Sequence, residues 1–156
     1  MLTALRSFLA ELGRDDRAEA RFSPDDYRLA SAALLFHDIA IDGTVSASER
    51  QRLEDLLQER YGLDAEATLE LIREAEIADQ EAVDLFHFTR VIKDKLELPD
   101  REAIIAMMWD LVFQDGTLHE FEDNTIWRVA DLIGVSRETR IRLKQTMRGH
   151  AGIAEA

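Results

Sequence analysis

The chain has 156 residues, which suits a single domain that can bury a core without covalent staples. Its 19 Lys and Arg residues stand against 32 Asp and Glu residues, and the resulting net charge of −13 disfavours binding to nucleic acids and to anionic membranes. Because the chain has no cysteine, disulfides, thiolate nucleophiles and cysteine-ligated metal sites are excluded.

The predicted elements are all helices. Leucines at spacings of three and four over residues 2–12 indicate a short amphipathic helix, followed by a polar loop. Ser23-Pro24 is a start signal for a nearly all-apolar helix over about 25–40. Further helices are predicted after the capping box Ser46-x-x-Glu49 up to Gly62, from Asp64 through Ala75, from about Glu81 to Lys95, from Pro99-Asp100 to Val112, around Ile126–Ile133, and from Ser136 to near Gly149.

Within the segment from about Glu81 to Lys95, the side chains predicted to face the core are Val83, Phe86, Val91 and Ile92. The fold class is therefore all-α, a compact single-domain bundle of about seven to eight helices spanning 1–156. Its core is expected over about 25–148, with an N-terminal helix and loop at 1–22 and a frayed tail at 149–156.

Targeting and membrane signals are not found in the sequence. The N-terminus lacks the uninterrupted apolar stretch of a signal peptide. The most apolar segments fall far short of the roughly 18 residues that a membrane span requires. We therefore expect a cytoplasmic protein without membrane insertion.

An internal repeat is predicted in the middle of the chain. A shift of 73 residues places the turn Asp42-Gly43-Thr44 on Asp115-Gly116-Thr117, and Glu49 on Glu122. Each copy then follows the same order of apolar helix, Asp-Gly-Thr turn, glutamate, amphipathic helix, glycine and a third helix. This pattern favours the duplication of a three-helix unit.

The doubled Asp-Gly-x5-Glu motif, set between an apolar and an amphipathic helix, resembles the TerB-like tellurite-resistance family. The second copy, Trp109 to Glu122, carries the stronger likeness, and the resemblance covers roughly residues 25–148. Asp110 matches an acid often found five residues before Asp-Gly in that family, whereas the first copy has His37 there, followed by Asp38. The resemblance implies an all-α domain of two related halves, a link to tellurite and stress resistance, and acidic clusters suspected of binding metal. It implies no enzymatic activity.

The repeated motif has two interpretations. In the structural one, the glycines supply the left-handed backbone that ends a helix, and the glutamates cap the next helix. In the other, the acids and the free carbonyl groups of the helix ends bind a divalent cation such as Ca²⁺, Mg²⁺ or Zn²⁺. The candidate ligands are Asp110, Asp115, Glu122, Asp38, Asp42 and Glu49, with His37 and His119 as further possibilities.

Catalysis and cofactor binding find no support among the motifs. The sequence contains no Gly-x-Ser-x-Gly, phosphate-binding glycine loop or dinucleotide fingerprint. The sequence predicts a non-enzymatic module with no cofactor other than a metal ion.

The remaining prediction concerns partners. Between Arg137 and Ala156 the chain has five cations and only two acids, so a basic terminal helix follows an acidic body. This helix could dock on another copy or on an acidic partner. The first hypothesis is a module that binds a divalent cation, a partner protein, or both; the alternative is a protein-binding scaffold whose Asp-Gly turns are only structural.

Overall fold

A computed structural model describes residues 22–41, 43–115 and 120–152. Helices account for most of these residues, and no strand occurs among them. The all-α prediction is therefore confirmed. In chain order the elements are α2 (Tyr27–Ala40), α3 (Ala47–Tyr61), α4 (Ala65–Glu81), α5 (Phe86–Lys95), α6 (Leu98–Val112), the 3-10 turn η1 (Phe113–Asp115), α7 (Glu120–Leu132) and α8 (Arg137–His150).

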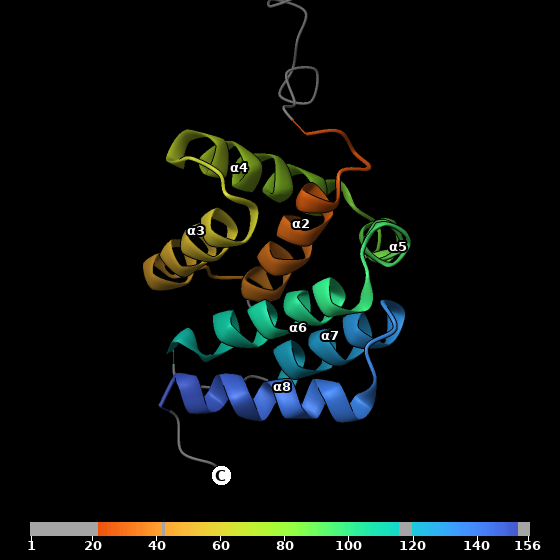
Figure 1. Cartoon of the computed structure of the whole chain (residues 1–156). Coiled ribbons are helices and arrows are strands. Elements are labelled where there is room, and N and C mark those ends of the chain that lie inside the picture. Colours follow the sequence, from red (N-terminus) through yellow and green to blue (C-terminus); the bar gives the residue numbers. More distant parts are fainter. Residues whose placement is uncertain (1–21, 42, 116–119, 153–156) are drawn as a thin grey trace, which may run out of the picture.

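Helix α2 lies at the centre of the bundle and contacts every helix from α3 to α7. Its sequence is apolar around the whole circumference, as expected for a helix with no solvated face. In Figure 1 it runs with α4 above it, α3 to its left, α5 to its right and the α6–α7 pair below. The core therefore forms around α2, and any polar residue in its buried part is carried into the interior.

Helix α6 forms the second layer of the core, and α8 covers it from outside (Figure 1). The Trp109 side chain of α6 is 1% exposed and stacks on Phe113, with ring centroids 5.9 Å apart. By contrast, α8 has no buried residue. It is thus a surface helix that contributes only partly buried apolar side chains to the core, such as Leu143 and Met147.

Several helix boundaries follow the predicted signals. The capping box at the start of α3 is present in both directions, because Ser46 Oγ accepts from the Glu49 amide and the Glu49 carboxylate accepts from the Ser46 amide. Asp64 caps α4 in one direction only, because its carboxylate accepts from the amide of Ala67 at 2.7 Å. Gly62 ends α3 in the left-handed conformation, with φ of 63°.

The predicted start of α2 at Ser23-Pro24 is wrong. These residues form a turn closed by the Asp26 amide and the Ser23 carbonyl. Asp26 is the N-cap instead, because its carboxylate accepts from the backbone amide of Arg28 at 2.8 Å and also pairs with the guanidinium of the same residue.

The segment predicted as one helix from Glu81 to Lys95 is also corrected. Helix α4 extends to Glu81, and α5 begins only at Phe86, where the Asp84 carboxylate accepts from the Phe86 amide. The break turns Val83 and Phe86 outward, with exposures of 101% and 62%. Val91 and Ile92, which follow the break, are buried as predicted.

Other predictions are not decided by the described residues. The leucine-rich helix at 2–12 lies outside them, and the internal duplication stays a prediction. None of the helices described combines the length and the apolar character needed to cross a membrane.

The left-handed turn after α3 leads to a stability prediction. Gly62→Ala should lower the free energy of unfolding by about 1–2 kcal/mol, since a Cβ is strained at positive φ even where space is open. Gly149→Ala, the same change within helix α8, should leave it unchanged or raise it by up to about 1 kcal/mol. Urea denaturation of both variants checks this, and an equal loss in both would contradict it.

Candidate functional site

The unusual feature of the interior is the carboxylate of Asp38. Asp38 belongs to the last turn of α2 and is fully buried. Among the described residues, neither of its carboxylate oxygens has a hydrogen-bond partner. Buried acids in proteins are normally paired, hydrogen-bonded or bound to a metal, because removing a charge from water is costly. Asp38 therefore requires either a proton or a cation.

Glu49 and Glu122 are the acids whose charges act on Asp38. Glu49 is in the first turn of α3 and Glu122 in the first turn of α7, and both are buried, with 8% and 4% exposure. One carboxylate oxygen of Glu49, Oε1, accepts from the Ser46 amide at 3.0 Å. Both glutamates lie in the first turn of a helix, where the helix dipole favours an acidic side chain.

Burial raises the pKa of Asp38 well above its ordinary value of 3.8, and the negative charges of Glu122 and then Glu49 raise it further. Desolvation is the largest cause, since the charged carboxylate loses its water without gaining a donor. Without a cation this carboxyl group favours the protonated state. A cation at Asp38 would reverse both effects by supplying opposite charge.

The described acids do not form a complete metal cage. No group of three or more His, Asp or Glu side chains within residues 22–41, 43–115 and 120–152 could hold a metal ion. Ca²⁺ prefers about six to eight oxygen ligands, whereas Mg²⁺ keeps several waters and binds through one or two carboxylates. The described acids are therefore too few for a dedicated calcium site.

Asp110, the predicted ligand in the second copy, has a different environment. Its two carboxylate oxygens accept from Nε and Nη2 of Arg52 at 2.9 and 2.8 Å, and one of them also accepts from Gln114. This fork-to-fork pairing joins α6 to α3. A cation ligated by Asp110 would have to displace Arg52. The structure therefore favours a structural role for Asp110, as the acidic partner of this ion pair.

Of the other predicted ligands, one is paired with another side chain and the rest lie outside what the structure describes. His37 binds Asp79 of α4 through Nδ1 at 2.8 Å, and so links α2 to α4. Asp42 and His119 lie outside the described residues, as does the side chain of Asp115. As ligands, these four residues and Asp110 stay predictions.

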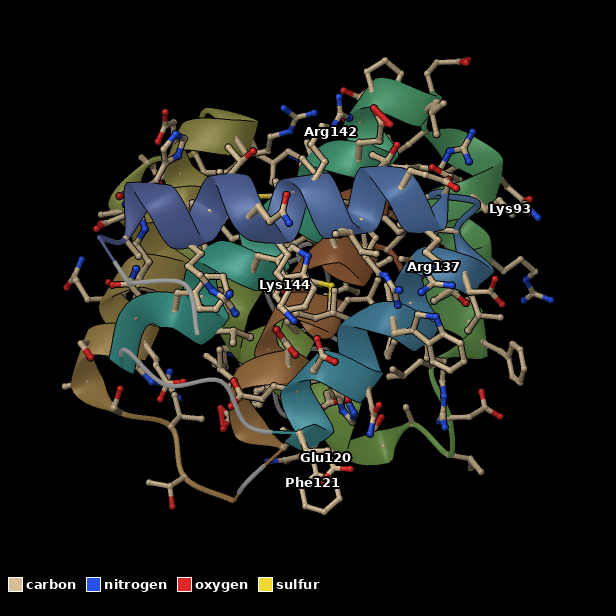
Figure 2. The ribbon with its side chains drawn as sticks, turned by 90° about the horizontal axis from the view of Figure 1, so that it is seen from below. Lys93, Glu120, Phe121, Arg137, Arg142 and Lys144 are labelled. Carbon is tan, nitrogen blue, oxygen red and sulfur yellow. The ribbon has the colours of Figure 1, made fainter. Side chains whose placement is uncertain are left out.

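Sequence reasoning missed an apolar groove of about 660 Å³ beside the His37–Asp79 pair. Its walls include Val83, Phe86 and Phe121, all strongly exposed. Figure 2 shows Phe121 at the start of α7, pointing away from the bundle. No local signal could have found this groove, because apolar residues at helical spacing predict a core face.

Comparison with known proteins places this fold in a family. A family model described as tellurite resistance protein TerB matches residues 28–145, which includes every helix from α2 to α7 and most of α8. Comparison with curated proteins and with solved structures gives no match. The match to the family model covers most of the chain, and the all-α bundle agrees with it. The chain belongs to the TerB tellurite-resistance family.

Proposed function

We propose that this TerB-family chain is a non-enzymatic module that binds a divalent cation at Asp38. The observation that carries the proposal is the fully buried carboxylate whose two oxygens lack a partner among the described residues. Mg²⁺ is the first candidate, because it is commonly bound through only one or two carboxylates. Zn²⁺ fits less well, since the histidine nearest in sequence, His37, is bonded to Asp79.

In this proposal the three buried acids have separate tasks. Asp38 ligates the cation, while Glu49 and Glu122 attract it through their charge. The cation removes the repulsion that raises the pKa of Asp38. It also ties the end of α2 to the starts of α3 and α7, the helices that bear the two glutamates. Binding would therefore stiffen the junction of three helices.

The two copies of the predicted repeat would contribute to a single site. Glu49 and Glu122 occupy equivalent positions of the two copies, and both act on Asp38. The position equivalent to Asp38 in the second copy is Leu111, which is fully buried and cannot ligate. This asymmetry favours one shared site over two separate ones.

A protein-binding scaffold is the alternative function. The observations that favour it are the capping box of Glu49, which gives this acid a structural role, and the exposed apolar groove beside α4 and α7. On this alternative Asp38 is simply a protonated acid in the core. Cation titration separates the two functions.

The first prediction from this proposal concerns cation binding. Mg²⁺ at millimolar concentration should raise the melting temperature of metal-stripped protein and release or absorb heat in calorimetry, with Ca²⁺, Mn²⁺ and Zn²⁺ as comparisons. Asp38→Asn should abolish both responses, because a neutral amide of the same shape cannot balance the cation. Glu122→Gln should weaken them.

Asp94→Asn is the matched control, since it removes one acid from the exposed surface of α5. It should bind the cation as the unaltered chain does. No heat and no thermal shift with any of the four ions would contradict the cation site and leave the scaffold function.

The second prediction concerns pH in the metal-free protein. A carboxyl group whose pKa is raised on folding holds its proton more tightly in the native state, so stability falls as pH rises from about 3.8 through the raised pKa. Relative to Asp38→Asn, the unaltered chain should lose free energy of unfolding across this window. Urea denaturation at several pH values measures the difference. A difference that is constant with pH would show that Asp38 does not titrate as its burial requires.

A further inference from the structure

Helix α8 concentrates positive charge on one face of an acidic protein. It contains Arg137, Arg140, Arg142, Lys144 and Arg148, against a single acid, Glu138. The whole chain has a net charge of −13, so this helix is the exception to its surface charge. The helix has no buried residue and is held on the surface by α6 and α7.

A groove of about 560 Å³ lies between α8 and α7. The cations that line it are Arg137, Arg140 and Lys144, its apolar lining includes Trp127 and Ile141, and Asp123 also belongs to the lining. Figure 2 shows Arg137 and Lys144 on the side of α8 that faces α7, whereas Arg142 extends from the opposite side. The exposures of Trp127 and Ile141, 56% and 38%, leave an indole and an aliphatic side chain accessible beside the charges.

The cations in the groove differ in how they are paired. Lys144 donates to Asp123 at 3.1 Å and lies 5.1 Å from the ring centre of Trp109. Arg137 and Arg140 form no salt bridge with any described residue. The groove therefore contains two guanidinium groups that pair with no carboxylate of the described residues.

Arg140 is nevertheless held in place. Its guanidinium lies over the Trp127 ring, 5.8 Å from the centroid. Asp131 lines a small hollow with the same three residues, Trp127, Arg137 and Arg140, but forms no salt bridge with either arginine. An arginine that stacks on tryptophan keeps its planar fork of donors free for a carboxylate.

We propose that this groove binds an acidic segment of another protein. Carboxylates of the segment would pair with Arg137 and Arg140, and one apolar side chain would pack on Trp127 and Ile141. Charge complementarity selects this occupant, because the groove offers unpaired guanidinium groups beside an indole of the kind enriched at interface hot spots.

This docking surface is independent of the proposed cation site. Helix α7 bears both features, but Glu122 is buried whereas Trp127 is exposed. The two can therefore be tested separately, and the failure of one leaves the other intact.

The test uses a fluorescein-labelled synthetic peptide in which glutamates flank one phenylalanine, added to the full chain and followed by fluorescence anisotropy. The double variant Arg137→Gln, Arg140→Gln should weaken binding about tenfold or more, and so should Trp127→Ala. Binding should also weaken as salt rises from about 50 to 500 mM, because ion pairs at the surface are screened. Circular dichroism verifies that each variant stays folded.

Arg142→Gln is the matched control, as it removes one cation from the opposite side of the same helix. It should change the affinity by less than about twofold, while a peptide with glutamine in place of glutamate should not bind. No binding by the unaltered chain, or equal losses in Arg142→Gln and the groove variants, would overturn the proposal. So would a salt-sensitive dimer that the groove variants abolish, or tighter binding of a single-stranded oligonucleotide than of the peptide.

Discussion

The burial of helix α2 on all sides is the constraint on which the rest of the structure depends. Its apolar residues are enclosed by five helices, and each large side chain removed from water contributes about 1.5–3 kcal/mol. Because the backbone of a helix is rigid, the packing of its apolar side chains also buries the polar residues of α2 that lie among them. Ser31 and Asp38 are both fully buried for this reason. The interior acid is thus a direct consequence of how the core forms.

The environment of Asp38 determines what chemistry the interior can support. A carboxylate without donors, facing two further buried acids, is unstable as an anion and must take up a proton or a cation. The charges that act on Asp38 are both negative, and Arg52 of helix α3 is paired with Asp110. Neutralisation must therefore come from solution. This need connects the fold of the TerB family, which the chain shares, with the proposed cation binding.

The surface of the protein combines acidic regions with one basic helix. Most of the exterior is acidic, which keeps copies of the chain apart and directs cations toward it. Helix α8 interrupts this acidic surface with a basic groove against α7, and the guanidinium of Arg140 lies over the exposed ring of Trp127. One helix, α7, thus contributes a buried acid to the interior and an aromatic anchor to the surface. Cation binding inside and partner docking outside would use different faces of the same element.

The amino-acid sequence alone determined the all-α fold, most helix boundaries and the acids at the two turns, since helical periodicity and capping depend on residues three or four positions apart. It also predicted the first-turn placement of Glu49 and Glu122. Only the tertiary structure decided which acids are paired. Arg52 pairs with Asp110 across 58 positions and His37 with Asp79 across 42, so Asp38 rather than Asp110 became the centre of the proposed site. The exposure of Val83 and Phe86 could likewise not be predicted from helical periodicity. Such contacts depend on how helices distant in sequence pack together, and local patterns contain no record of that packing.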